Sequence, residues 1–272
     1  MQPEVFGLNA YTSATVLGYA LGVVIGVGLG LRDGRDLRDL LEMGLVVVLS
    51  AVLGAKVFHT LFEAAGHRLP DGTTASGLLD LLRADPWHWA RLFESGYVFY
   101  GGVLGALGLG YLFTRRAGFE HRGSFGDYAT PGLALGIFVG RLGCFMAGCC
   151  YGSGTDLPWA VQFPSSHPTH GAAVHPVQLY DAAFGLLAFV GASLRYRSRR
   201  FPGELFAGLF VSYTIWRFST ELFRADADRG VWWLGMSTSQ WVSLVSLPIA
   251  LFLWWKAAKR GWSHHVEAEV QP

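Results

Sequence analysis

The sequence predicts an all-α integral membrane protein with about seven transmembrane helices. Of its 272 residues, 51% are hydrophobic and only 15% carry a formal charge. The mean hydropathy of +0.33 agrees with this class and is not typical of a soluble enzyme. The formal net charge is +1, so no nucleic-acid partner is expected.

Apolar runs of the length that crosses a bilayer, about 20 residues, give the individual helices. Seven such runs cover residues 10–31, 43–63, 97–114, 126–150, 177–194, 204–223 and 239–256. Two of them are interrupted by polar groups, the second by Lys56 and His59 and the fourth by Arg141. The N-terminus has no basic segment before its first apolar run, so we expect that run to be a retained span and not a cleaved signal peptide.

Domain organisation and orientation follow from the segments between the runs. No linker or repeat divides the chain, so we expect one transmembrane domain over 1–272, with an outer loop at 64–96 and a short tail at 257–272. The loops after runs one, three, five and seven carry most of the arginines and lysines, whereas 151–176 has none. Because such charges gather on the cytoplasmic side, the N-terminus is predicted outside and the C-terminus in the cytoplasm.

With this orientation, polar residues from five spans converge on the outer face. The sequence therefore predicts a polar cavity between the helices that opens to the outer leaflet. The residues that face it are Tyr11, Tyr100 with Gly101 and Gly102, Arg141 to Gly152, His175, Gln178, Tyr180 and Asp181, and Arg217, Glu221 and Arg224.

The arginines of this set suit a phospholipid head group. Arg141 lies inside a span, where a charged side chain is costly and usually functional. Arg217, Glu221 and Arg224 are spaced to share one helix face, and one carboxylate leaves net positive charge for an anion. The alternative is a structural Arg217–Glu221 ion pair, with Arg224 as an interfacial anchor. The segment from His175 to Asp181 is equally compatible with a helix-start anchor.

The cysteines allow a third interpretation, a metal or redox site. In a helix that continues through the segment, Cys149 and Cys150 lie on faces away from Cys144, and a cluster requires the helix to end near Gly148. Buried cysteines that act as small apolar residues are the preferred interpretation. No metal and no cofactor are therefore expected.

At these residues the chain resembles the prolipoprotein diacylglyceryl transferase family, over most of its length. Residues 140–152, GRLGCFMAGCCYG, resemble the family pattern GRxGNFxNGExxG. HPVQLYD at 175–181 resembles HPSQLYE, and RFSTELFR at 217–224 resembles the arginine-rich end of the family's sixth span. FYGG at 99–102 stands where the family has HGG, Tyr11 where it has a functional tyrosine, and DLPWAVQFP at 156–164 resembles the stretch after the main pattern.

The resemblance implies a reaction, its partners and a location. The family moves diacylglyceryl from phosphatidylglycerol to the lipobox cysteine of a prolipoprotein and releases glycerol phosphate, at the bacterial cytoplasmic membrane. Carried over by motif, Arg141, Arg217, Tyr100 and Glu221 are the expected catalytic residues. Substrate binding is expected at Tyr11, Gly101, Gly102, Cys144, Gly152, His175, Gln178, Tyr180 and Arg224.

Three departures from the family pattern leave alternatives open. Tyr100 replaces a histidine, Cys144 an asparagine and Cys149 a glutamate. A tyrosine with an ordinary pKa of about 10 is a poor base near neutral pH, so another base, such as His59, or local positive charge is needed. The alternatives to the transferase are a paralogue that binds phospholipid but uses another acceptor, and a thiol-based redox or metal-binding membrane protein.

Overall fold

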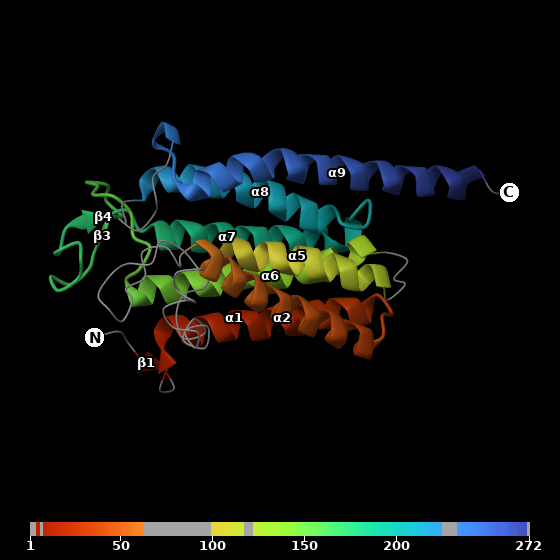
Figure 1. The fold of residues 1–272 in the computed structure, drawn as a ribbon, viewed down its shortest axis with the longest axis horizontal. Coiled ribbons are helices and arrows are strands. Elements are labelled where there is room, and N and C mark those ends of the chain that lie inside the picture. The colour runs from red at the N-terminus through yellow and green to blue at the C-terminus, as the bar shows by residue number, and fades with distance from the viewer. Residues whose placement is uncertain (1–3, 6–7, 63–98, 117–121, 225–232, 271–272) are drawn as a thin grey trace. The chain divides into compact units, whose positions relative to one another are not determined.

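The computed structural model describes residues 4–5, 8–62, 99–116, 122–224 and 233–270, and most of these are helical (Figure 1). Seven α-helices lie in these ranges, which confirms the all-α membrane class predicted from the sequence. They are α1 (Ala10–Arg32), α2 (Leu37–Phe62), α5 (Phe99–Arg116), α6 (Arg122–Ala147), α7 (Val177–Arg195), α8 (Glu204–Thr220) and α9 (Thr238–Val270).

The remaining elements are short. Strand β1 (Glu4–Val5) pairs antiparallel with β2 (Leu8–Asn9), and β3 (Val161–Gln162) pairs antiparallel with β4 (Ala173–Val174). Single 3₁₀ turns follow or precede the long helices: η1 (Tyr196–Ser198), η2 (Glu221–Phe223) and η4 (Trp233–Gly235).

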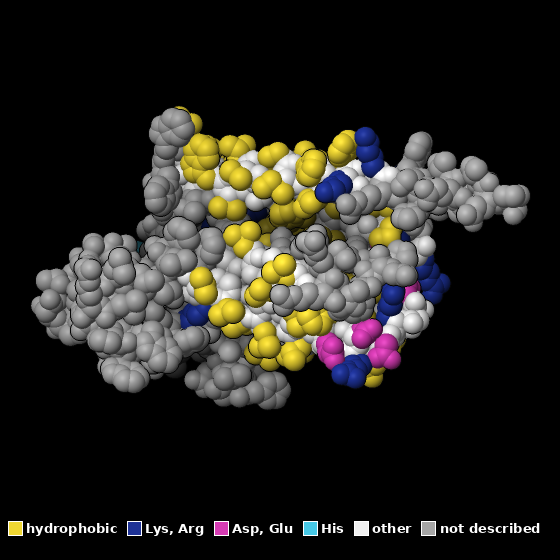
Figure 2. All heavy atoms as spheres, turned by 45° about the vertical axis from the view of Figure 1, so that its right-hand side comes forward, with side chains coloured by type: hydrophobic (Ala, Val, Ile, Leu, Met, Phe, Trp, Pro, Cys, Tyr) yellow, Lys and Arg dark blue, Asp and Glu magenta, His cyan; other side chains and the backbone are white. Residues whose placement is uncertain are grey.

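Five of the described helices are long and apolar enough to cross a membrane: α1, α2, α6, α7 and α9. Many of their apolar side chains are exposed, as Leu187 (72%) and Leu194 (78%) on α7 illustrate, and Figure 2 shows hydrophobic side chains along the helices. A water-soluble protein rarely exposes so much contiguous apolar surface. Lipid contact explains it.

The helices share most of their residues with the predicted spans but differ from them at several ends. Helix α2 begins at Leu37, before the predicted span that starts at 43. Helix α6 ends at Ala147 and not at 150, because Gly148 takes a left-handed φ of 73°. Helix α9 continues to Val270 through the segment predicted as a tail.

The described chain divides into two compact units, and each has its own packing. Unit 2, Gly34–Arg122, holds α2 and α5, which touch backbone to backbone. A β-carbon on Gly54 would lie 2.8 Å from Cα of Gly105, and one on Gly102 would lie 3.2 Å from the Ala51 carbonyl oxygen. Glycine permits this close approach between membrane helices. Gly101 and Gly102 are both buried in this unit.

Unit 1, Met1–Asp33 with Gly123–Pro272, holds α1 and α6 to α9. Helices α1 and α6 run antiparallel with glycines in contact: Gly18 faces Gly136, and Gly22 faces Gly132. A β-carbon on Gly132 would lie 2.5 Å from the Gly22 carbonyl oxygen, so any larger residue there would separate the two helices.

Helix α8 is anchored at its start by a carboxylate of α6. Asp127 is fully buried and accepts hydrogen bonds from the backbone N–H groups of Gly203 (2.8 Å), Leu205 (2.9 Å) and Phe206 (3.3 Å). The first N–H groups of a helix have no partner within it, so a carboxylate from another helix can satisfy them. Arg199, which pairs with Asp33, lies 3.7 Å from the same carboxylate.

Candidate active site

Several segments of unit 1 meet at one end of its helices. Helices α6 and α8 end there, and α1, α7 and α9 begin there, next to the β3–β4 pair (Figure 1). Most of the candidate residues of unit 1 lie on these segments, so the convergence predicted from the sequence is present within this unit.

The turn after α6 is built by two backbone hydrogen bonds and a histidine. The N–H of Gly148 donates to the Phe145 carbonyl and that of Cys149 to the Cys144 carbonyl, both at 3.1 Å. The Gly148 carbonyl in turn lies 2.7 Å from Nε2 of His167. Left-handed φ values at Gly148 (73°) and Cys150 (61°) then redirect the chain away from the helix axis. A non-glycine residue such as Cys150 rarely adopts this conformation.

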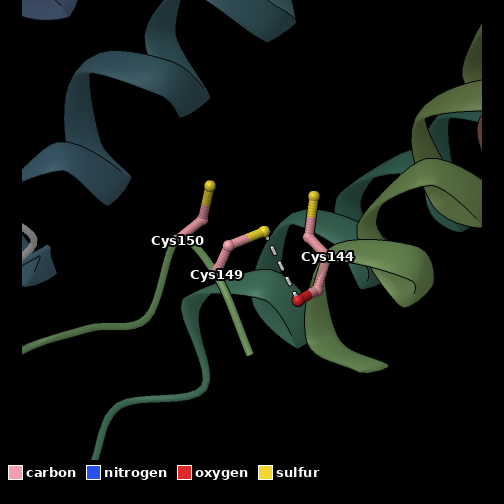
Figure 3. A group of neighbouring side chains, drawn as sticks. All are labelled: Cys144, Cys149 and Cys150. Carbon is pink, nitrogen blue, oxygen red and sulfur yellow. Dashed lines mark hydrogen bonds between the residues drawn. The ribbon is translucent and has the colours of Figure 1, made fainter. Parts of the chain in front are cut away.

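This turn gathers the three cysteines, whose sulfur atoms all lie within 4.8 Å of one another (Figure 3). The condition for a cluster, a helix that ends near Gly148, is met, and the expectation of buried cysteines is only partly correct. It holds for the burial of Cys144, but Cys149 is exposed and Cys150 is half-buried. All three thiols are free, and the Cys149 thiol donates to the Cys144 carbonyl at 3.7 Å.

The charge environment of the cluster favours a thiolate at Cys150. The neighbouring Cys144 and Cys149 thiols and then the positive charges of Arg224 and Arg141 lower the pKa of the Cys150 thiol, whereas its burial acts in the opposite direction. Thiolates are the reactive and metal-binding form of cysteine.

Arg141 of α6 forms an ion pair with Asp181 of α7. Its Nη1 lies 3.3 Å from Oδ2 of Asp181, whose side chain is 4% exposed. The other carboxylate oxygen accepts a hydrogen bond from Nε1 of Trp216 at 2.8 Å. The guanidinium is thus fixed on one side, while its remaining N–H groups can serve an anion. Trp216 was not among the residues expected from the sequence, because nothing in the local pattern gives it a partner on α7.

Arg217 and Glu221 form the second ion pair, which closes α8. The side chains are 9% and 1% exposed. Nη2 of Arg217 also donates to Oγ of Ser239 at 2.9 Å, at the start of α9. The sequence does not predict the contact of Arg217 with Ser239, because an isolated serine gives no indication of its partner.

Arg224 does not share the helix face of Arg217 and Glu221, contrary to the spacing argument. Helix α8 ends at Thr220, the turn η2 follows, and Arg224 itself is extended (φ −83°, ψ 146°). Its backbone instead forms an isolated antiparallel bridge with Gly152. Three arginines and two carboxylates nevertheless belong to this end of unit 1, which leaves the net positive charge that was expected.

Gly152 lies at a three-way backbone crossing. A β-carbon there would lie 2.5 Å from Cβ of His175, 2.7 Å from the His175 carbonyl oxygen and 2.8 Å from that of Phe223. Its N–H donates to the His175 carbonyl at 2.9 Å, and the next residue, Ser153, donates to Phe223 at 2.7 Å. The structure therefore gives Gly152 a packing role, and its expected substrate contact stays a prediction.

The first turn of α7 connects this crossing to the cysteine turn. Gln178 is fully buried and donates from Nε2 to the Cys149 carbonyl at 2.7 Å. Its Oε1 has no hydrogen-bond partner among the residues that the structure describes. The hydroxyl of Tyr180 lies 3.2 Å from Nδ1 of His175 and accepts a hydrogen bond from Nε1 of Trp159 at 2.8 Å.

The remaining candidates lie on α1, α2 and α5. Gly101 and Gly102 pack within unit 2, and the side chains of Tyr100 and His59, on α5 and α2, lie outside the described residues. Tyr11 stands in the first turn of α1 with 47% of its surface exposed, and its hydroxyl is close enough to the thiols of Cys144, Cys149 and Cys150 to interact with them electrostatically. The predicted contacts of these residues with substrate are untested.

Comparison with known proteins gives one consistent family. The sequence profile described as "Prolipoprotein diacylglyceryl transferase" matches residues 3–256. A protein of Idiomarina loihiensis is 33% identical over 232 residues, which are 83% of this chain and 78% of the relative. One of Solidesulfovibrio magneticus is 31% identical (90% and 87% covered), and one of Clostridium tetani is 30% identical (92% and 94% covered). All three carry the name phosphatidylglycerol–prolipoprotein diacylglyceryl transferase.

Proposed function

Because the chain belongs to the prolipoprotein diacylglyceryl transferase family, we propose that it moves diacylglyceryl from phosphatidylglycerol to the lipobox cysteine of a prolipoprotein. The observation that carries the proposal is the pairing of Arg141 with Asp181 and of Arg217 with Glu221 at the same end of unit 1. Both arginines are held by carboxylates, so little reorganisation is needed when charge develops nearby.

In this reaction the acceptor thiolate attacks the glycerol carbon that carries the phosphate ester, and glycerol phosphate leaves. The phosphate gains negative charge as the carbon–oxygen bond breaks. Arg141 and Arg217 stabilise that charge through their guanidinium N–H groups, with Arg224 as a third cation. Glu221 holds Arg217 in position, and His175, Gln178 and Tyr180 order the segment that lies against the cysteine turn.

The protein is a multi-pass membrane protein, and its relatives are bacterial. We place it in the cytoplasmic membrane as one transmembrane domain, with the N-terminus outside. The arginine-rich loops, which include Arg195, Arg197, Arg199 and Arg200 after α7, support this orientation. The cluster of ion pairs then lies towards the outer leaflet, where a lipobox peptide can reach it.

A second candidate is a paralogue that binds phospholipid but uses another acceptor. The observation that favours it is the change of three polar family positions, now Tyr100, Cys144 and Cys149, while the arginines are kept. The two candidates differ in the acceptor and agree on the lipid.

The test is a reconstituted assay with phosphatidylglycerol and a lipobox peptide that follows glycerol phosphate release and thioether formation together. Arg141→Ala should lower kcat by about 10²–10³-fold, the usual effect of removing one donor that stabilises developing charge. Arg141→Ala with Asp181→Asn removes the pair without leaving a lone buried carboxylate, so loss of activity in a stable double variant reports the phosphate contact.

The matched control is Arg197→Ala, since this exposed arginine stands in η1 at the other end of α7. It should keep full turnover. Full turnover of Arg141→Ala would show that the phosphate-site argument is wrong. Lipid binding without any thioether would favour the paralogue.

A further inference from the structure

The cysteine cluster is the strongest feature that the family reaction leaves unused. Cys144, Cys149 and Cys150 are the only three cysteines of the chain, and one turn gathers all of them. In a tetrahedral zinc site, with zinc–sulfur bonds of about 2.3 Å, the sulfur atoms lie about 3.8 Å apart. The observed separations, all within 4.8 Å, need only small side-chain rotations to reach that geometry.

The surroundings hold the cluster in place and leave one side open. Helix α6 fixes Cys144, and Gln178 holds the Cys149 carbonyl at 2.7 Å. The buried Cys144 and the exposed Cys149 place the cluster at the boundary between the protein interior and its surface. A fourth ligand can therefore arrive from outside, as in catalytic zinc sites, which keep one open position.

The nearby charges suit a metal held by three thiolates. A divalent ion with three thiolates carries one net negative charge. Arg224 and Arg141 belong to the same end of unit 1 as the three cysteines. These cations can offset the excess charge of the occupied site. Soft thiolate ligands of this kind favour zinc over magnesium or calcium.

We propose that Cys144, Cys149 and Cys150 bind a zinc ion whose fourth coordination position takes the acceptor thiol of the lipobox peptide. This inference rests on the proposed function. It departs from the expectation of a metal-free protein, and it supplies the thiol activation that Tyr100 is poorly suited to give.

The chemical step balances without any oxidant or reductant. The acceptor thiol binds the ion and releases its proton to water, because coordination deprotonates a thiol. The sulfur then forms a bond to the glycerol carbon as the bond from that carbon to the phosphate oxygen breaks. The electron pair of the broken bond leaves with glycerol phosphate, and the ion stays divalent throughout.

The first experiment replaces zinc with cobalt in the purified, reduced, full-length chain and measures the sulfur-to-cobalt charge-transfer absorption. All proteins carry His264→Gln and His265→Gln, which remove two adjacent histidines near the C-terminus that can also bind cobalt. We expect one cobalt ion per chain and an increase in the absorption when a lipobox peptide is added. A peptide with serine in place of its cysteine should give no increase.

Cys149→Ser is the informative variant, because its exposed side chain can change without disturbing the helix packing. It should weaken the absorption and the response to peptide. An unchanged spectrum after replacement of all three cysteines by serine would overturn the proposal. A wild-type spectrum that does not change when the peptide thiol is added would also overturn it. So would a disulfide between two of the cysteines in membranes whose transferase activity is at its full rate.

The second measurement is turnover with and without metal. At pH 7 a free thiol with a pKa of about 8.5 is about 3% ionised, so removal of zinc should lower turnover by up to about 30-fold. Zinc should restore the rate, and magnesium should not. The residual metal-free rate should rise about tenfold per pH unit below the thiol pKa, whereas the zinc form should vary little.

The two measurements separate this inference from the proposed function. Equal turnover after complete metal removal would refute the zinc site and leave the transferase in place. If no condition gives thioether but the cobalt spectrum still responds to the peptide thiol, the proposed reaction is wrong and the thiol-binding metal site stands.

Discussion

Replacing Gly152 by alanine tests whether this glycine serves packing or substrate binding. The added β-carbon would lie 2.5 Å from Cβ of His175 and 2.7 and 2.8 Å from two carbonyl oxygens. All three distances are well below van der Waals contact, and two of the neighbours are backbone atoms, which cannot rotate away. Overpacking of this kind costs about 1–3 kcal/mol.

The displaced segments are those that carry the proposed chemistry. The bridge from Gly152 leads to Arg224, and the crossing carbonyl belongs to His175. A displacement of about 1 Å at a reacting group can lower the rate by about 100-fold. Gly152→Ala should therefore lower both the thermal stability in detergent and the kcat of the phosphatidylglycerol–peptide reaction.

Gly154→Ala is the matched control, two residues away in the same loop. Its β-carbon would meet only the Ala173 carbonyl oxygen, at an ordinary 3.8 Å. Unfolding temperatures measured for both variants, together with kcat and KM, decide the matter. Equal stability and equal kcat for the two variants would refute the packing argument, and a raised KM alone in Gly152→Ala would indicate direct substrate contact.

Two further predictions concern single hydrogen-bonded groups. Asp127→Ala leaves the first N–H groups of α8 without their carboxylate and should lower the free energy of unfolding by about 1–3 kcal/mol. Asp156→Ala, at an exposed position, should change it very little, and denaturant titration of both variants measures the difference. Ser239→Ala removes a hydrogen bond to the Arg217 guanidinium, and losing about 1.5 kcal/mol should lower the rate in the turnover assay about tenfold. Ser212→Ala, at an exposed position on α8, should leave the rate unchanged. Equal rates for the two variants would contradict the role given to Ser239.

The helices were predictable because a segment that crosses the lipid bilayer must be apolar along its whole length. Each of the seven apolar runs corresponds to a helix, and α7 begins at Val177 as expected. The helix ends were less predictable, since they depend on single backbone angles. The left-handed Gly148 ends α6 three residues early, and neither length nor hydropathy contains that information.

The site was predictable as a set of residue types at one end of the helices, but not as a set of contacts. The arginines stood out because charge is rare in membrane helices. Their partners across the fold did not, since Asp181 and Ser239 belong to other helices and periodicity relates only residues of one helix. The cysteine cluster depended on the same unpredicted turn after Ala147.

The glycine contacts between α1 and α6 have a consequence for biosynthesis. Gly18 and its partner Gly136 are separated by 118 positions, and all of unit 2 is encoded between them. At about 5–20 residues per second, the ribosome needs roughly 6–24 s to make the missing partner. Helix α5 is complete at Arg116, so α2 and α5 can pair before Gly136 is made, whereas until then α1 presents its glycine stripe to lipid. The first helix to enter the membrane is thus among the last to pack against its partner helix.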